Sequence, residues 1–176
     1  ISSRKMNEFY FIDHSTTTLE ASYNSGGNFN KGGDFIYRWG NPFNYNRGDE
    51  TSQILQSQHS VNWIHPSFPG GGDIILFNNR NEEIGSEILQ ISTPVDSYTY
   101  EINLNEPHAP ADYSWRYGDG SFFSNIQSGA FRLENGNTLI SIGDRAEFFE
   151  IDTTLTIVWG YEFTGPSGQE FSGKIP

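Results

Sequence analysis

The sequence predicts an all-β chain, and three observations lead to this fold class. Aromatic residues make up 15% of the 176 residues, and 19 Gly and 8 Pro are available for tight turns. This composition favours short strands over helices. No stretch keeps a helical period for more than about ten residues. Finally, a unit of strands with an Arg at a fixed place recurs three times, which is the pattern of a repeat architecture.

Each copy of the repeat contains an apolar strand that ends in Arg, a strand that begins with Glu, and a strand with an aromatic residue near its end. The strands are expected at residues 1–4, 8–13 and 34–40 in the first copy, 73–80, 87–91 and 113–118 in the second, and 137–145, 147–152 and 155–161 in the third. A further apolar strand precedes the second and third copies, at residues 57–64 and 127–133. The complete unit therefore has four strands, a to d in chain order.

Four-stranded antiparallel units in tandem are typical of the blades of a β-propeller, and we expect about two and a half blades here. One partial domain is expected to contain the end of a blade and its connection at 1–56, a second blade at 57–120, a third at 121–162, and the start of the next connection at 163–176. A β-sandwich is the alternative, but it does not explain an Arg at one register. Because the chain opens inside a strand, we expect it to be a piece of a longer protein.

Composition also narrows the partners and cofactors. The net charge is −12, from 22 acidic and 10 basic residues, so a nucleic acid would be repelled over most of the surface. No apolar run reaches the roughly 18 residues of a membrane-spanning helix. There is no Cys, which excludes disulfides, Cys-ligated zinc and thiol catalysis within this chain. The acidic residues show no metal-loop spacing, and we expect no metal or other cofactor.

The repeat predicts a cationic site at one end of a channel. In a propeller, strand a lines the channel and the b–c connections share one face. Arg4, Arg80 and Arg145 all fall at b–c connections, and His59 falls at the start of a strand a on the same face. Arg side chains suit tetrahedral oxyanions such as sulfate. Five amides are expected to add neutral donors on this rim: Gln58, Asn78, Asn79, Asn125 and Gln127.

Structural roles for the same residues stay open. The recurrent Arg can brace neighbouring blades by pairing with acidic residues such as Glu8, Glu87 and Glu147. A single His at the start of a strand can be a hydrogen-bonded structural residue rather than a catalyst.

Segments along nearly the whole chain are similar to one known family. They are residues 1–4, 12–17, 32–42, the pair Gln58–His59 with Trp63, and residues 136–140. These segments resemble the bacterial arylsulfotransferase (aryl-sulfate sulfotransferase) family. The resemblance implies a six-bladed propeller, periplasmic or secreted, that moves a sulfuryl group from a phenolic sulfate ester to a phenol without a nucleotide sulfate donor.

The resemblance also implies roles for individual residues. His59 matches the Gln-His motif of the family and is implied to contact the sulfate or to act as an acid or base. Arg80 is implied to be catalytic, and Arg4 and Arg145 to bind the substrate with Gln58, Asn78 and Asn79. The family carries the sulfuryl group on a histidine, which would stand near residues 143–145, where this chain has Gly-Asp-Arg. Two further functions stay open: a propeller that binds a sulfated or anionic ligand or a partner protein without turnover, and a hydrolase.

Overall fold

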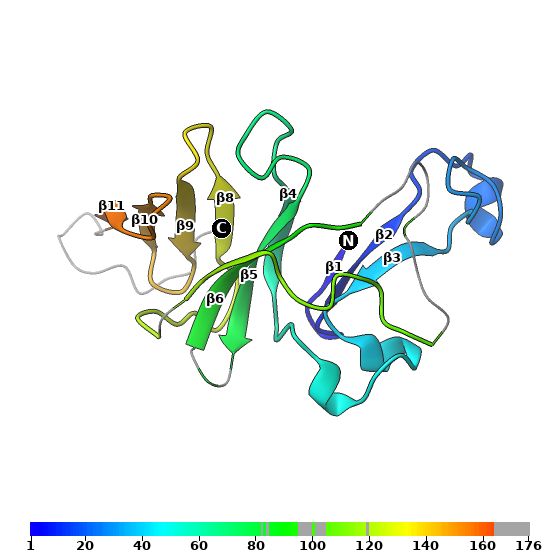
Figure 1. Ribbon diagram of the computed structural model, residues 1–176, viewed down its shortest axis with the longest axis horizontal. Coiled ribbons are helices and arrows are strands. Elements are labelled where there is room, and N and C mark those ends of the chain that lie inside the picture. The colour runs from blue at the N-terminus through cyan, green and yellow to red at the C-terminus, as the bar shows by residue number, and fades with distance from the viewer. Residues whose placement is uncertain (82, 84, 95–99, 101–104, 119, 164–176) are drawn as a thin grey trace. The chain divides into compact units, whose positions relative to one another are not determined.

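The computed structural model shows an all-β chain and describes residues 1–81, 83, 85–94, 100, 105–118 and 120–163 (Figure 1). Within these residues, helical structure is limited to three short 3₁₀ segments: η1 (Glu20–Ser22), η2 (Pro42–Tyr45) and η3 (Glu50–Ser52). The predicted fold class is therefore confirmed.

The described strands form three antiparallel sheets, in each of which the strands pair in chain order. The first sheet contains β1 (Ser2–Ser3), β2 (Glu8–Ile12) and β3 (Phe35–Trp39); the second contains β4 (His59–Trp63), β5 (Ile74–Asn81), β6 (Gly85–Ile91) and β7 (Trp115–Tyr117); the third contains β8 (Gly129–Arg132), β9 (Thr138–Ile142), β10 (Glu147–Ile151) and β11 (Ile157–Glu162). Each copy of the sequence repeat thus forms one sheet. The strand expected before the second and third copies is the first strand of its sheet.

The strand that precedes each recurrent Arg ends at a different point in the three sheets. Arg80 lies inside β5, whereas Arg4 follows β1 and Arg145 follows β9 in a turn. The strand that became β9 was expected to reach Arg145, but β9 ends at Ile142 because the chain turns there. The Arg145 N–H bonds the Ile142 carbonyl, and Ala146 is left-handed at φ 53°.

The chain divides into two compact units. Unit 1 comprises Ile1–Leu55 and Thr93–Asp112, and unit 2 comprises Gln56–Ser92 and Tyr113–Pro176. The blade expected at residues 57–120 stays a prediction; in this division the described residues 105–112 belong to unit 1. Tyr37 and Trp39 hold that segment by donating to the carbonyls of Ala109 and Pro110, both at 2.8 Å. Of the connection expected at 163–176, only Phe163 lies among the described residues.

Unit 1 is built around the aromatic face of its sheet. Phe9 of β2 pairs with Trp39 of β3, and Phe11 pairs with Tyr37, so the four rings lie on one face. Phe9, Tyr37 and Trp39 are almost completely buried. Clustered aromatic rings bury a large area per residue, and tilted or offset pairs add to that burial. This compensates for the small size of a three-stranded sheet.

Unit 2 is a pair of sheets packed face to face. Its core joins Ile75, Phe77 and Ile88 of the β4–β7 sheet to apolar side chains of the β8–β11 sheet, among them Ile140 and Phe149. The two first strands, β4 and β8, lie side by side, and Asn62 of β4 donates to the carbonyls of Ile75 and Ala130 at 3.3 and 3.2 Å. Both the apolar core and this amide hold the two sheets together.

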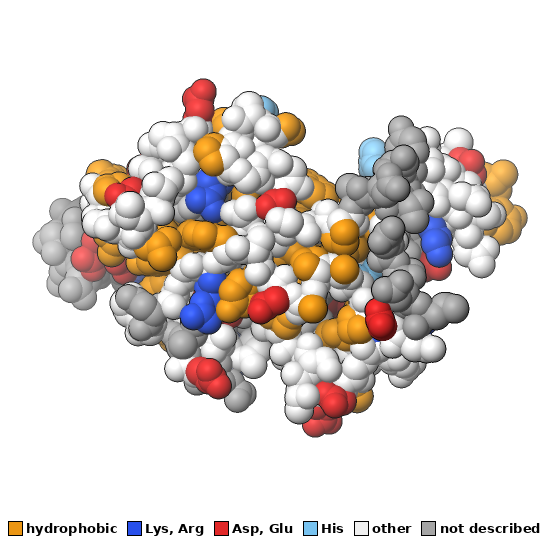
Figure 2. All heavy atoms as spheres, viewed as in Figure 1, with side chains coloured by type: hydrophobic (Ala, Val, Ile, Leu, Met, Phe, Trp, Pro, Cys, Tyr) orange, Lys and Arg blue, Asp and Glu red, His pale blue; other side chains and the backbone are white. Residues whose placement is uncertain are grey.

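The two faces of the β8–β11 sheet differ. One face contributes to the core, while the other exposes an aromatic row: Phe131, Trp159 and Tyr161 are 45%, 48% and 51% exposed. Cross-strand pairing places Phe131 and Trp159 at opposite ends of one row of that face. Figure 2 shows acidic side chains scattered over the side in view among hydrophobic and neutral ones, with few Lys or Arg, in keeping with the net charge.

Candidate functional site

His59 begins β4 as the sequence predicts, and two hydrogen bonds fix its imidazole. Its Nδ1 lies 2.8 Å from Oδ1 of Asn79, and its Nε2 lies 3.3 Å from the backbone N–H of Gln127. Asn79 donates its amide N–H groups to the carbonyls of Ser124 and Gln127, both at 3.1 Å. This fixes Oδ1 as the atom that faces His59. Since Oδ1 only accepts, Nδ1 must carry the proton and Nε2 the lone pair.

The backbone on both sides of His59 is strained. Ser57 and Ser60 are left-handed at φ 58° and 54°, and so are Gln127 and Ser128 at φ 54° and 76°. None of the four is Gly, and non-Gly residues are uncommon in this region of the Ramachandran map. β4 also has a β-bulge between His59 and Asn62. Left-handed residues and bulges concentrate at functional sites, where surrounding contacts hold them.

A network of small polar side chains holds the Gln127 loop against β5. Ser86 donates to the Asn79 carbonyl at 2.7 Å and accepts from the Ser124 N–H at 2.9 Å. Ser128 donates to the Ser124 hydroxyl at 2.8 Å and accepts from the Gly143 N–H at 2.9 Å. Because a fully satisfied buried network rigidifies its surroundings, the donor to Nε2 of His59 is held in place.

The imidazole borders an open cavity of about 340 Å³ in unit 2. The cavity is lined by the first strands and by the turns that flank them: His59, Ser60, Gln127, Ser128, Gly129, Phe131, Ser141 and Gly143. Gly129 stands at the start of β8 as His59 stands at the start of β4, and a Cβ there would lie 2.8 Å from the Ser60 hydroxyl. A side chain at that position would therefore fill the space in front of His59. The volume suits a small oxyanion or one aromatic ring.

The structure brings Arg80 to the edge of this network. Its guanidinium is exposed and donates to Oδ1 of Asn125, whose own N–H bonds Asp144 at 2.9 Å. Arg145 lies half-exposed in the next turn. Arg4 is half-buried in the β1–β2 turn of unit 1, and its place in a site with Arg80 and Arg145 stays a prediction.

Three of the five amides expected on the rim are buried. Gln58, Asn78 and Asn79 are all 0% exposed. Asn78 accepts from the Gln56 N–H at 2.6 Å and donates to Glu87 at 2.8 Å. In this structure Asn78 and Asn79 hold the frame of the site, and their contact with a ligand stays a prediction.

Arginines pair with the three glutamates that lie at or near the starts of β2, β6 and β10. Glu8 receives two bonds from Arg38 at 2.6 and 3.1 Å, and Glu87 lies 4.0 Å from Arg116. Of the recurrent arginines only Arg145 has an ion pair with such a glutamate among the described residues, 3.9 Å from Glu147. Each of these pairs joins parts of one sheet, so bracing between neighbouring blades by the recurrent Arg stays a prediction.

The sequence predicts Gln127 on the rim as a side-chain donor, whereas it reaches His59 through its backbone N–H, which no residue type reveals. Ser86, Ser124 and Ser128 were not predicted, because serines are common residues in and beside strands. A signal was present for Arg38 and Arg116, since each sits between two aromatic residues of a fourth strand, in Tyr-Arg-Trp and Trp-Arg-Tyr.

Among the described residues, no three His, Asp or Glu side chains are grouped closely enough to hold a metal ion. The same part of the chain contains no helix with the length and apolar character needed to cross a bilayer. No protein-family model, curated protein or solved structure matches this chain.

Proposed function

We propose that this chain is part of a β-propeller that transfers a sulfuryl group from a phenolic sulfate ester to a phenolic acceptor, without a nucleotide sulfate donor. Support for a propeller comes from the tandem sheets with strands in chain order, the face-to-face packing in unit 2, and the adjacent first strands β4 and β8. First strands line the channel of a propeller, which would place His59 at its wall. The arylsulfotransferases that the sequence resembles act in the periplasm or outside the cell, and we propose the same location here.

The observation that carries the proposal is the orientation of His59 by Asn79. A general base needs a free lone pair and a third group that fixes its tautomer, and Asn79 supplies the latter at Nδ1. Nε2 accepts the Gln127 N–H at 3.3 Å, beyond the usual N–H···O range of about 2.7–3.2 Å. The hydroxyl of an acceptor phenol in the adjoining cavity can replace so long a bond.

The transfer then runs as a direct displacement at sulfur. The acceptor oxygen forms its bond to sulfur as the bond from sulfur to the donor's phenolic oxygen breaks. The acceptor's proton passes to Nε2 of His59, which later releases it to solvent, and the donor's oxygen leaves as a phenolate. The imidazole is neutral before and after the reaction. This route needs no covalent sulfuryl-histidine, and it therefore agrees with Gly143, Asp144 and Arg145 standing where the family would have that histidine.

Arg80 has the chemistry to neutralise the sulfuryl oxygens. Charge on the transferred group is stabilised mainly by positioned cations and hydrogen-bond donors. The Arg80 guanidinium is exposed and is held by Asn125, an uncharged partner. Exchanging that amide for a sulfuryl oxygen would leave no buried charge unpaired.

The test is nitrophenolate release from nitrophenyl sulfate by the purified protein, with and without phenol. We expect phenol to stimulate release and His59→Ala to lower the rate about 10²–10³-fold. His65→Ala is the matched control, because His65 is exposed and bonds only its neighbour Ser67 among the described residues. Nitrophenolate release at a rate that phenol does not change would indicate hydrolysis instead. An unchanged rate in His59→Ala would remove His59 from the mechanism.

One observation favours a second function, anion binding without turnover. Both ring nitrogens of His59 are already engaged within the protein, as they would be in a purely structural residue. In that case folded protein would release no nitrophenolate, yet phenyl sulfate would bind in a calorimetric titration, and Arg80→Gln would weaken the binding.

A further inference from the structure

Unit 1 contains a cavity that the proposed function does not use. Its volume is about 560 Å³, within the range of roughly 300–1,000 Å³ that is typical of small-molecule sites. It lies between the end of β3, the segment that carries η2 and η3, and residues 106–111. All these elements belong to unit 1.

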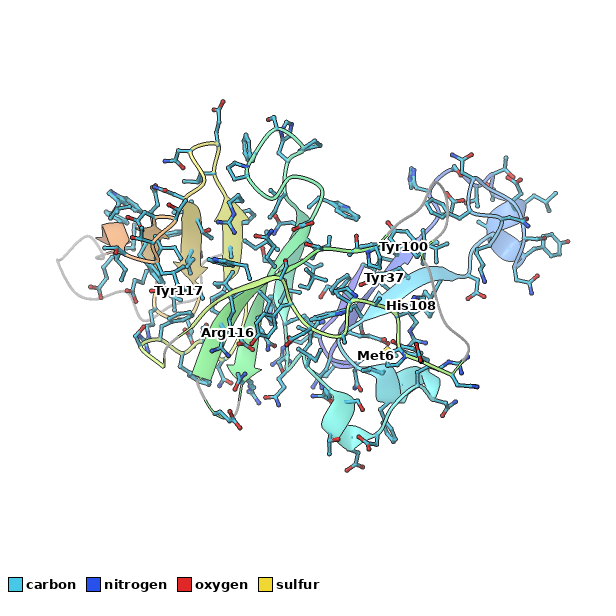
Figure 3. The ribbon with its side chains drawn as sticks, in the orientation of Figure 1. Met6, Tyr37, Tyr100, His108, Arg116 and Tyr117 are labelled. Carbon is cyan, nitrogen blue, oxygen red and sulfur yellow. The ribbon has the colours of Figure 1, made fainter. Side chains whose placement is uncertain are left out.

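The wall formed by residues 105–111 is fixed by hydrogen bonds at several points. Tyr37 and Trp39 bind the carbonyls of Ala109 and Pro110 at 2.8 Å, and Arg47 donates to Asn105 at 2.9 Å. Figure 3 shows His108 beside Tyr37, and the centroids of these two rings are 5.3 Å apart. The cavity therefore has a built wall, which spares a ligand the cost of ordering it.

The cavity presents aromatic rings and few hydrogen-bonding groups. Trp39, Tyr45 and His108 contribute rings, and Tyr45 and His108 meet at 60° with centroids 5.8 Å apart. The indole N–H of Trp39 is used by Pro110, and the hydroxyls of Thr51 and Ser52 both donate to Asp49. The Tyr45 hydroxyl accepts the His108 N–H at 3.4 Å, which leaves its own proton to donate.

The walls carry little net charge. Burial, followed by the charges of Arg38, Lys31 and Arg47, lowers the pKa of His108 to about 4, so its ring is neutral at pH 7. Arg38 is paired with Glu8 at 2.6 Å and stacks on Tyr45, with its guanidinium carbon 4.5 Å from the ring centroid. Glu106 also lines the cavity, and its carboxylate disfavours an anion.

We propose that this cavity binds a small, uncharged aromatic molecule that carries one hydrogen-bond acceptor, with Tyr45 and His108 as ring walls and the Tyr45 hydroxyl as the donor. Ring pairs at the observed geometry contribute beyond the area they bury. The inference does not depend on the proposed function, because none of its residues belongs to unit 2.

Naphthol is a suitable probe, titrated into the whole chain at pH 7 by calorimetry with ligand-observed NMR. We expect saturable binding with Kd on the order of 0.1–1 mM, as befits a ligand of this size. Tyr45→Leu should weaken it about fivefold to tenfold. Ala111→Trp, at an exposed residue that lines the cavity, should abolish binding by filling the space. Phe43→Ala is the matched control, since Phe43 lies in the same η2 but does not line the cavity.

Two related compounds test the chemistry of the ligand. Naphthalene sulfonate should bind at least tenfold more weakly, because its charge would lose solvation in a cavity lined mainly by rings and by the carboxylate of Glu106. The saturated alcohol decahydronaphthol should also bind more weakly, because it has no aromatic face. Binding of either related compound as tight as that of naphthol, or binding of naphthol that survives Ala111→Trp, would overturn the proposal. So would an absence of naphthol binding to the folded chain.

Discussion

The two sheets of unit 2 have the same strand order but differ in what surrounds them. In the β4–β7 sheet, Ile74, Leu76 and Leu89 are buried, and so are Ile75, Phe77 and Ile88 on the opposite face. In the β8–β11 sheet only one face is buried, and the other exposes Phe131, Trp159 and Tyr161. Stability should therefore depend on both faces of the first sheet and on one face of the second.

The sheets also differ in polar chemistry where their first and second strands meet the candidate site. The β4–β7 sheet places His59 and Asn79 there, whereas the corresponding ends of the β8–β11 sheet carry Gly129 and Gly143. The second sheet contributes a loop instead, whose Gln127 N–H reaches His59. The repeat thus gives both sheets the same strand arrangement, and the candidate site arises where neighbouring copies carry different residues.

The largest expected effect separates the two faces of the β8–β11 sheet. Phe149 is 5% exposed and contacts Tyr117 and Phe122, with ring centroids 6.2 and 5.8 Å away. Phe149→Ala should lower the free energy of unfolding by about 4 kcal/mol through lost burial and a cavity. Trp159→Ala, at a 48% exposed residue, should cost less than about 1 kcal/mol. Urea denaturation measures both, and equal losses would mean that the aromatic row is buried in solution.

The next effect concerns the polar end of the β4–β7 sheet. Asn79 is 0% exposed and bonds His59 and two carbonyls. Asn79→Ala leaves these groups unpaired and should lower the free energy of unfolding by about 3 kcal/mol. Asn125→Ala, at an exposed amide of the loop that carries Ser124 and Gln127, should lower the free energy of unfolding by about 0.5 kcal/mol or less in the same denaturation assay. A loss below about 1 kcal/mol for Asn79→Ala would contradict the role given to this network.

Ion pairs provide a smaller contrast between the sheets. Glu87 is 2% exposed and faces Arg116 at 4.0 Å, whereas Glu147 and Arg145 are 3.9 Å apart with side chains 39% and 50% exposed. Arg116→Met should cost about 1–2 kcal/mol because it removes a cation from beside a buried carboxylate. Arg145→Met should cost about 0.5 kcal/mol or less. Thermal unfolding at low and high salt distinguishes them, and a salt-sensitive loss in Arg145→Met larger than that in Arg116→Met would reverse the assignment.

The smallest effect arises where the sheets differ in the connection between their last two strands. A tight turn at Asp152 joins β10 to β11, whereas residues 92–114, which include His108, separate β6 from β7. Burial, then the charges of Arg38, Lys31 and Arg47, lowers the pKa of His108 from 6.5 to about 4. The folded chain thus binds this proton less readily than the unfolded chain.

The sign of the pH dependence of stability follows from the lowered pKa of His108 in the folded chain. The contribution of His108 to stability is complete above pH 6.5 and is lost as the pH falls toward 4. We expect a loss of about 1 kcal/mol, less than for a fully buried ring because solvent reaches part of it. The measurement is denaturant unfolding of wild type and His108→Gln between about pH 7 and 4.5. The same pH dependence of the free energy of unfolding in the two proteins would contradict the expectation.

Much of the fold could be predicted from the sequence because strands and turns are local. The runs that became β5 and β9, and the Gly-rich or Asn-rich turns before them, are visible in a few neighbouring residues. The division into units was not predicted, since it depends on contacts such as those of Tyr37 and Trp39 of β3 with the backbone of Ala109 and Pro110, 72 and 71 positions away. Such contacts leave no local pattern.

The sequence predicts that His59, Asn79 and Gln127 share one end of the strands, but it does not predict the contacts among them. The start of a strand and the recurrence of Arg are sequence patterns, whereas the inward direction of Asn78 and Asn79 depends on which neighbours pack against β5. The partner of Nε2 is a backbone N–H 68 positions from His59. The sequence pattern suggests the recurrent Arg as the partner of Glu8 and Glu87, whereas in the structure these carboxylates pair with Arg38 and Arg116.

The most direct test of the account is the tautomer of His59, because the site and the proposed function both depend on how Asn79 holds it. Heteronuclear NMR of the side-chain nitrogens at neutral pH, assigned with His59→Gln, identifies which nitrogen carries the proton. The account predicts a proton on Nδ1 and a lone pair on Nε2, with the preference reduced in Asn79→Ala. A proton on Nε2 in the wild-type protein would contradict it.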